Sequence, residues 1–323
     1  MAKARAIVKR RKAVRNIKKI TKTMQMIATA KFQKSLKRAV GTKPYTMKVR
    51  ELVREVAANV EGVDHPLLRK LTKETTSNRI AIVVITSNRG LAGAYNGSVL
   101  RLALSFIREQ EAAGKQIDLS VIGKKGISYF NYQKKPIKNR SEAKDVPAYA
   151  DVEAGLNPLI ARFTSGEIDA VYVVYMNFIS AGQQKPDVLT LLPLVGVREI
   201  ADYVGLQASE KESQVDAGIA NRSHRGPVKV EETTDEKVIY EFSPSARDLL
   251  DELLPLTLKT AFFQTFLDAT TSEHVARMIA MKSATDAADK MGKALTMQYN
   301  RARQSQITTE LSEIMGGVEA MKA

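Results

Sequence analysis

The chain has 323 residues, of which 44% are apolar and 26% charged, and its formal net charge is +15 at pH 7, so it has the composition of a globular protein that buries a sizeable core. It contains no cysteine and only three histidines, at scattered positions, which excludes disulfides and thiolate catalysis and disfavours a metal site. No apolar run approaches the ~20 residues of a membrane span, and no signal peptide is evident, so we expect an intracellular, soluble protein that could dock on a membrane complex.

The first 50 residues form a strongly basic segment. They hold 11 Lys and 6 Arg and no Asp or Glu, so their positive charge exceeds that of the whole chain. Apolar residues recur in this segment at spacings of seven and three, which is typical of a coiled-coil seam. These residues are Ile7, Val14, Ile17, Met24 and Ile27. Other seam positions, such as Thr21 and Ser35, are polar, and the periodicity fades near residue 60 after an expected kink at Gly41 and Pro44.

Strands and helices alternate through the middle of the chain. Mainly apolar runs predict strands, and the continuous run at 80–85 has the pattern of a strand that is buried on both faces. The runs lie at 80–85, 119–122, 170–176 and 188–192. Helices are predicted from the loop at 90–97 to about residue 113, after Gly126, and at 151–165. This alternation predicts a Rossmann-like α/β domain with a mainly parallel sheet, in which 188–192 is an antiparallel edge.

Two glycine-containing loops follow predicted strands, where phosphates often bind. Neither the loop at 90–97 nor Gly123-Lys124-Lys125-Gly126 has a complete nucleotide-binding pattern. We therefore interpret both as tight strand-to-helix turns, and we expect no cofactor. Residues 205–237 are polar and then acidic, which predicts an exposed insert. A short strand is expected after it, at 238–242.

The chain ends in a long periodic segment. A helix is predicted to start near Ala246 and to feed a terminal helix that begins at Thr270 or Ser272, with a stop at Gly316-Gly317. The terminal helix would be roughly 65 Å long, so its apolar stripe needs a partner. The N-terminal stripe is the simplest partner, in an antiparallel two-helix coiled coil. The expected domains are an N-terminal helix (1–60), an α/β domain (61–245) and a C-terminal helix (246–323).

The basic segment has three other interpretations. It could be a solvated charge run, a transit peptide, or the arm of a basic nucleic-acid-binding protein. Against the last, its only aromatic residues are Phe32 and Tyr45, and no helix-turn-helix or RNA-binding motif is present. An enzyme with a doubly wound sheet is a further alternative, which lacks the expected fingerprints.

The segments described above resemble the gamma subunit family of rotary (F-type) ATP synthases. The similarity covers nearly the whole chain and is strongest towards its end. The matching segments are 16–24, 89–93, 122–126, 276–286, 299–304 and 307–317. The resemblance implies a non-catalytic rotor subunit, the central stalk. Its terminal helices would form a shaft inside a ring of three alpha and three beta subunits, and its middle domain would contact the epsilon subunit and the membrane c-ring.

The resemblance also implies roles for individual residues. Ten of them would contact beta-subunit loops: Lys18, Lys19, Lys22, Met24, Arg89, Leu91, Arg303, Gln304, Thr308 and Glu310. Tyr240 and Glu241 would lie in the foot near epsilon and the rotor ring.

Further expectations come from the family as a whole. They are one copy per complex, no cofactor, no nucleic-acid partner, and a peripheral position on the cytoplasmic side of the cell inner membrane. Photosynthetic relatives carry a regulatory insert where 205–237 stands here, in plants with a redox cysteine pair. The absence of cysteine excludes such a switch, and we hypothesise that this insert still tunes ATP hydrolysis.

Overall fold

A computed structural model describes residues 2–42, 45, 48–49, 66–68, 77–194 and 246–322. Its contacts divide the chain into two compact units. The helical unit comprises residues 1–31, 91–93 and 274–323, and the sheet unit comprises 32–90 and 94–273. None of the helices in the described ranges combines the length and apolar character that crossing a bilayer requires.

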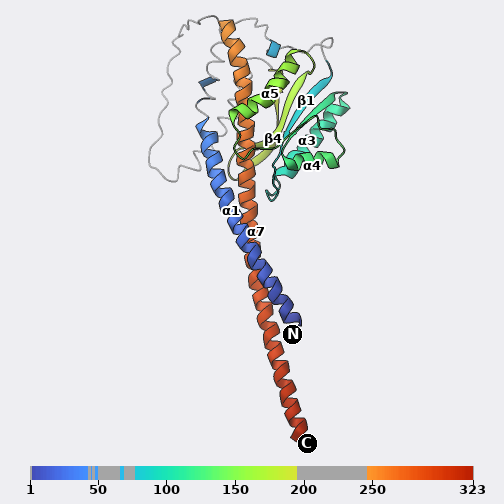
Figure 1. The fold of residues 1–323 in the computed structure, drawn as a ribbon, viewed down its shortest axis with the longest axis vertical. Coiled ribbons are helices and arrows are strands. Elements are labelled where there is room, and N and C mark those ends of the chain that lie inside the picture. The colour runs from blue at the N-terminus through green and yellow to red at the C-terminus, as the bar shows by residue number, and fades with distance from the viewer. Residues whose placement is uncertain are drawn as a thin grey trace, which may run out of the picture. The chain divides into compact units, whose positions relative to one another are not determined.

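The helices and strands that the sequence predicts within the described residues occur in the expected order, with one additional strand, β3 at Asn139–Ser141 (Figure 1). They are α1 (Ala2–Gly41), the 3-10 helix η1 (Pro66–Leu68), β1 (Arg79–Ile85), α3 (Tyr95–Ala112), β2 (Gln116–Ile122), α4 (Lys124–Tyr132), β3 (Asn139–Ser141), α5 (Tyr149–Thr164), β4 (Ala170–Phe178), β5 (Gln184–Leu192) and α7 (Ala246–Lys322). The expected strand at 238–242 and the insert at 205–237 lie outside the described residues.

The sheet unit contains one five-stranded sheet with the order β3-β2-β1-β4-β5. β1 pairs in parallel with β2 and β4, and β2 pairs in parallel with β3. β5 pairs antiparallel with β4, so the mainly parallel sheet with an antiparallel edge is confirmed. β3 was not predicted, because its three residues are all exposed and form no apolar run.

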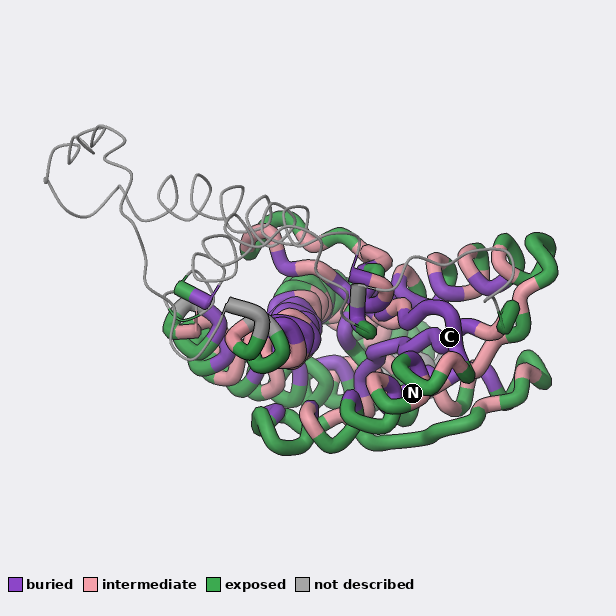
Figure 2. Tube along the Cα trace, turned by 90° about the horizontal axis from the view of Figure 1, so that it is seen from above, coloured by how far each residue is buried: buried purple, intermediate pink, exposed green. Residues whose placement is uncertain are grey.

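The core of the sheet unit lies between the sheet and two helices. Ile80 to Ile85 are all buried, as a central strand covered on both faces requires. Figure 2 shows that buried segments, drawn in purple, are surrounded by exposed ones. α5 adds Val152, Leu156, Leu159 and Phe163, whose spacing of three or four places them on one helix face. The part of α7 that belongs to this unit adds Leu254, Leu258 and Phe262.

The Gly123–Gly126 loop is a packed turn. Gly123 has a φ of +100°, and a Cβ added there would lie 2.2 Å from the carbonyl oxygen of Thr86. A Cβ on Gly126 would lie 2.6 Å from Thr86 Oγ1, which accepts a hydrogen bond from the Gly126 N–H at 3.0 Å. Both glycines are therefore required by close packing, which supports the interpretation of this loop as a tight turn.

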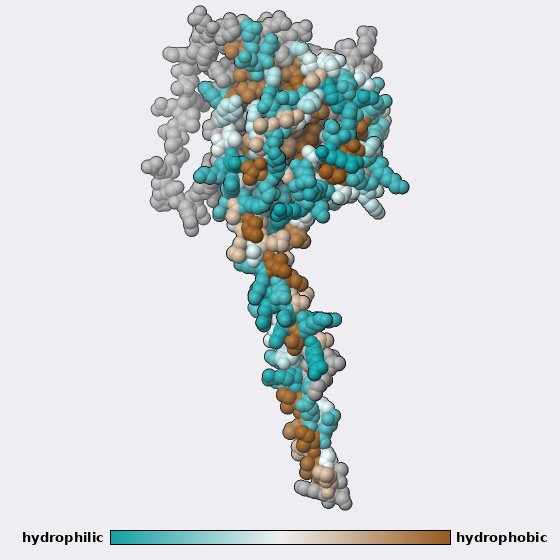
Figure 3. Space-filling view, in the orientation of Figure 1, coloured by the Kyte–Doolittle hydropathy of each residue, from teal (hydrophilic) through white to brown (hydrophobic). Residues whose placement is uncertain are grey.

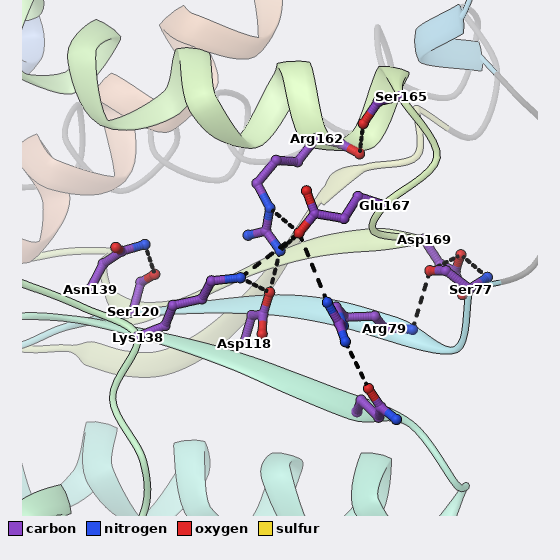
Figure 4. Close-up of polar contacts among 11 residues, drawn as sticks. Ser77, Arg79, Asp118, Ser120, Lys138, Asn139, Arg162, Ser165, Glu167 and Asp169 are labelled. Carbon is purple, nitrogen blue, oxygen red and sulfur yellow. Dashed lines mark hydrogen bonds and ion pairs between the residues drawn. The ribbon is translucent and has the colours of Figure 1, made fainter.

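A charged cluster ties α5 to the sheet (Figure 4). The Arg162 guanidinium donates to Asp118 and, at 2.6 Å, to Glu167. Lys138 Nζ donates to Asp118 at 2.7 Å. Burial by itself raises the pKa of Asp118, but the hydrogen bonds from Lys138 and Arg162 and their charges outweigh burial, so this pKa lies below its ordinary value.

We expect Asp118→Asn to lower the free energy of unfolding by about 1–2 kcal/mol at pH 7, because two charge-assisted hydrogen bonds are lost. The folded-state pKa of Asp118 is lowered, so its contribution is complete above the unfolded-state pKa and disappears as the pH falls through the folded-state value. Urea unfolding at pH 7 and below pH 4 measures both effects. Glu111→Gln, which removes an exposed pair with Lys135, is the control and should cost under about 0.5 kcal/mol. Equal losses for the two variants at pH 7 would contradict the prediction.

The helical unit is an antiparallel pair formed by α1 and α7, which confirms the predicted coiled coil. The two helices present residues to each other at spacings of four and three. On α1 the buried or half-buried positions include Ile7, Arg11, Val14, Thr21, Gln25 and Ala28. On α7 they include Met281, Thr285, Ala288, Gly292, Leu295, Tyr299 and Ala302.

The predicted seam on α1 was wrong in part. Val14 is buried as expected, and so are the polar seam positions Thr21 and Ser35, but Ile17 and Ile27 are exposed. The predicted stop at Gly316-Gly317 was also wrong, because α7 continues to Lys322. Each glycine lowers helix stability by about 1 kcal/mol without ending the helix, since no proline follows. Likewise α7 has no boundary at Thr270, where a second start was predicted.

Candidate functional site

The described residues offer little for catalysis or metal binding. Within those ranges, no group of three or more His, Asp or Glu side chains could hold a metal ion. The sheet unit has a cavity of about 440 Å³ beside α5 and β2. Its charged lining residues include Arg162, which pairs with Asp118, and Lys144, which pairs with Asp151 at 2.7 Å. The two basic side chains are thus already paired with carboxylates of the same chain. The exposed surfaces of the helical unit are therefore the better candidates for function.

The first candidate surface is on α1. Lys19 and Lys22 are exposed, and Met24 is half-buried. Lys18 differs from them because it forms an ion pair with Asp289 of α7, and its hydrogen bond and charge lower the pKa of that carboxyl group. Of the predicted contact residues on α1, Lys18 is thus already engaged within the chain.

An apolar stripe that the sequence reasoning missed lies on the same helix. We call Ile17, Ile20, Met24 and Ile27 the outer stripe, because their spacing of three and four places them on one side of α1. The three isoleucines are between 51% and 60% exposed. Isoleucine is among the residues most often buried, so three of them exposed in one row indicate a surface that a partner covers. The signal in the sequence was the pattern itself, which had been assigned to the seam.

The second candidate surface is the tip of the loop before α3. Leu91 has a φ of +60° and is 61% exposed, while the adjacent Ala92 is buried. Both the left-handed backbone and the exposure are unfavourable for leucine. Gly93 lies two residues after Leu91, and a Cβ added there would lie 3.8 Å from Ala276 O and Ala280 Cβ of α7, so this tip packs on that helix. Arg89, two residues before Leu91, is exposed.

The third candidate surface is the far end of α7. Arg303 and Gln304 are exposed, the Thr308 hydroxyl donates to the Gln304 carbonyl at 3.0 Å, and Glu310 accepts from Gln306 at 2.8 Å. These two bonds stay within α7. They leave the outer faces of the side chains accessible.

From Ile307 onwards, α7 also carries a row of exposed apolar side chains (Figure 3). They are Ile307, Leu311, Ile314, Met315, Val318 and Met321. Because Arg11 of α1 lies over the ring of Tyr299, α1 begins opposite a point near residue 308 of α7. About 20 Å of α7 therefore extends past the described part of α1.

The structure brings some predicted residues together and separates others. Lys22 and Met24 lie near the level of Thr285, because Thr21 contacts that residue. Gly93, two residues after Leu91, lies close to Ala280. Arg303 to Glu310 begin about 27 Å farther along α7 than Thr285. Tyr240 and Glu241 lie outside the described residues, so their predicted role is not addressed by the structure.

Comparison with known proteins identifies close relatives. A family model described as ATP synthase matches residues 3–321. The chain is 41% identical to the ATP synthase gamma chain of Rhodopirellula baltica, with 100% of both chains covered. It is 35% identical to that of Leptospira biflexa, covering 99% of this chain and 100% of the relative.

Solved structures show the same fold. A chain in the Euglena gracilis mitochondrial ATP synthase (OSCP/F1/c-ring, rotational state 3) matches with a TM-score of 0.61 at 16% identity, covering 99% of this chain and 95% of that one. A chain in the Tetrahymena thermophila mitochondrial ATP synthase (central stalk/c-ring) matches with a TM-score of 0.51 at 18% identity, covering 82% and 99%.

Proposed function

This chain belongs to the ATP synthase gamma chain family, and from that premise we propose how its helical unit couples rotation to ATP chemistry. A gamma chain is a non-catalytic subunit, the central stalk of the rotary ATP synthase. The alternative of a basic nucleic-acid-binding protein finds no support among the relatives.

The observation that carries the proposal is the unbroken α7 helix paired with α1. α7 runs for 77 residues, or roughly 115 Å. Apart from Pro255, which has no N–H to donate, the interior residues of α7 can form the hydrogen bonds that close each helical turn, and packing against a second helix resists bending. Such a pair transmits a twisting moment along its length. Turning this asymmetric pair inside a ring of catalytic subunits would favour a different conformation in each of them.

We assign the contacts with the ring to the three candidate surfaces. The outer stripe together with Lys19 and Lys22 suits a beta-subunit surface that is both apolar and acidic. Leu91, held exposed in a left-handed conformation, suits an apolar contact at a similar level of the shaft. Arg303, Gln304, Thr308 and Glu310 suit polar loops farther along. The exposed apolar end of α7 suits an apolar sleeve, in which it could turn without locking.

The proposed assembly contains one copy of this chain, three alpha and three beta subunits, an epsilon subunit and the membrane c-ring. The gamma chain is a peripheral component of a membrane complex. We place it on the cytoplasmic side of the cell inner membrane, because the relatives named above come from bacteria. We propose that Tyr240 and Glu241 lie in the foot, the region near the epsilon subunit and the c-ring. Regulation of ATP hydrolysis by residues 205–237 is a separate hypothesis. Unchanged ATP hydrolysis after deletion of that insert would argue against regulation.

Replacing Lys19 and Lys22 together by glutamine tests the proposed charge complementarity. We expect the rate of association with the alpha–beta hexamer to fall about three- to ten-fold at low salt, with the difference shrinking as ionic strength rises. Stopped-flow binding at several salt concentrations measures this.

The matched control replaces Lys134 and Lys185, two exposed lysines of the sheet unit, by glutamine. This pair removes the same net charge from elsewhere on the chain. An equal loss of rate in the control would show that net charge alone steers association, and the assigned surface would be wrong.

A further inference from the structure

In the middle of the α1–α7 seam, between Val14 and Ala28 of α1 and between Met281 and Leu295 of α7, the inward positions given above are small or polar. The seam residues Ala28, Ala288 and Gly292 are too small to define the axial alignment of the two helices, that is, which residues of α1 lie opposite which residues of α7. Helices with larger seam residues fix this alignment through side chains that fit into matching holes. In this stretch, contacts other than apolar packing can therefore contribute to the alignment of α1 and α7.

Among the described residues, the polar side-chain contacts that join the two helices include the following three. The Thr21 and Thr285 hydroxyl oxygens lie 2.8 Å apart, Lys18 pairs with Asp289, and the Arg11 guanidinium lies 4.9 Å from the centre of the Tyr299 ring. The Lys18–Asp289 pair is largely solvent-exposed, so its contribution is small. The threonine pair differs, because Thr21 is only 9% and Thr285 only 8% exposed.

The two hydroxyl groups form a complete hydrogen-bond chain. Thr285 Oγ1 also lies 2.8 Å from the Met281 carbonyl, and Thr21 Oγ1 lies 3.2 Å from the Lys18 carbonyl. Each hydroxyl has one proton, so one threonine donates across the seam while the other donates to a carbonyl of its own helix. The cross-helix bond exists only when the two residues are level.

Other alignments lose these contacts. A displacement of α7 by one seven-residue repeat would bring Gly292 or Met278 opposite Thr21, and neither side chain can accept or donate a comparable bond. The same displacements would bring Thr296 or Lys282 opposite Lys18, and the second of these is a like charge. Shorter displacements also separate the two threonines, while the small seam residues tolerate them.

We propose that the buried Thr21–Thr285 hydroxyl pair fixes the axial alignment of the two shaft helices and opposes their sliding past one another. A buried polar contact is well suited to this role, because it favours one alignment at little gain in stability. Thr21 and Thr285 are positioning residues, and the inference stands whether or not the proposed partner contacts are right.

Spin labels at Lys9→Cys and Glu313→Cys test the proposal in the full chain. The native sequence has no cysteine, so the two labels are unique, and both positions are exposed. They lie roughly 20 Å apart along the axis, and sliding by one turn changes that separation by about 5 Å. Pulsed electron–electron distance measurements report the resulting distribution.

Two double variants separate alignment from packing. Thr21→Val with Thr285→Val keeps the side-chain shape and removes the hydroxyls. We expect the distance distribution of this variant to be at least about 1.5 times as wide as that of the parent chain, or to show a second maximum about one helical turn away. Thr21→Ser with Thr285→Ser keeps the hydroxyls and removes the methyl groups, and we expect the single narrow distribution of the parent chain. We expect thermal stability to follow the opposite order, with valine at least as stable as threonine and serine less stable. An unchanged distribution in the valine variant, or broadening in the serine variant, would overturn the proposal.

Discussion

The variant Gly123→Ala is expected to unfold the sheet unit or to lower its free energy of unfolding by about 3–5 kcal/mol. The residue has a φ of +100°, which an L side chain rarely adopts, and the new Cβ would lie 2.2 Å from the Thr86 carbonyl oxygen. That oxygen belongs to the main chain directly after β1, so it cannot rotate away as a side chain could. Moving it would also displace the Thr86 N–H, which donates to the Ile122 carbonyl at 2.8 Å.

Chemical denaturation followed by far-ultraviolet circular dichroism measures this loss. The matched control is Gly97→Ala in α3, where nothing lies within 4 Å of the added Cβ. Alanine is the better helix former by about 1 kcal/mol, so this control should be neutral or slightly stabilising. If both variants unfolded at the same denaturant concentration, the loop at 123–126 would not be the tight turn described above.

The second large effect is expected from Ala28→Asp in the helical unit. Ala28 is 2% exposed at an inward position of α1, where a carboxylate would be both desolvated and too large. Burying such a charge without a designed partner destabilises by about 3 kcal/mol or more, which is enough to separate the two helices locally. A separated pair bends more easily, so we expect ATP synthesis in the reconstituted complex to fall more than tenfold.

Ala30→Asp is the control, because it makes the same substitution two residues away at an exposed position. We expect it to retain at least half of the ATP synthesis of the parent complex. Helical content of the full chain, measured alongside synthesis, separates loss of the shaft from loss of a partner contact. Two equally damaging substitutions with unchanged helical content would point to a contact with the ring instead.

The sequence predicted the centre of the sheet well because β1 and β4 consist largely of continuous apolar runs. Such runs, at Ile80 to Ile85 and Ala170 to Met176, are typical of strands in a sheet that is covered by helices on both faces. β3 escaped prediction, since its exposed residues pair only along one edge and their burial leaves no pattern.

The seam was harder to predict than the sheet, for a physical reason. Hydrophobicity alone favours Ile17 over Thr21 as an inward residue, yet Thr21 is the buried one. Thr285 offers the buried Thr21 a hydroxyl at the matching level, from a position 264 residues away in the chain. A periodicity search along α1 does not include that residue.

Similarity to the family proposes which residues form the candidate site, but it does not give their geometry. Similarity to the family singled out Leu91, but its positive φ and its exposure became visible only in the structure. Similarity also grouped Lys18 with Lys19 and Lys22, although Lys18 is paired with Asp289. Charge counts describe how many cations a helix carries and say nothing about which of them are already neutralised.

The spacing of four and three along both shaft helices has a mechanical consequence. A repeat of seven residues falls slightly short of two turns of a straight α-helix, so two helices that keep it wind around each other as a left-handed rope. Torque that tightens the left-handed supercoil presses the two helices together, whereas torque in the opposite direction loosens the supercoil and separates them. The torsional stiffness of this pair is therefore chiral, and equal torques applied clockwise and counter-clockwise should store different amounts of elastic energy.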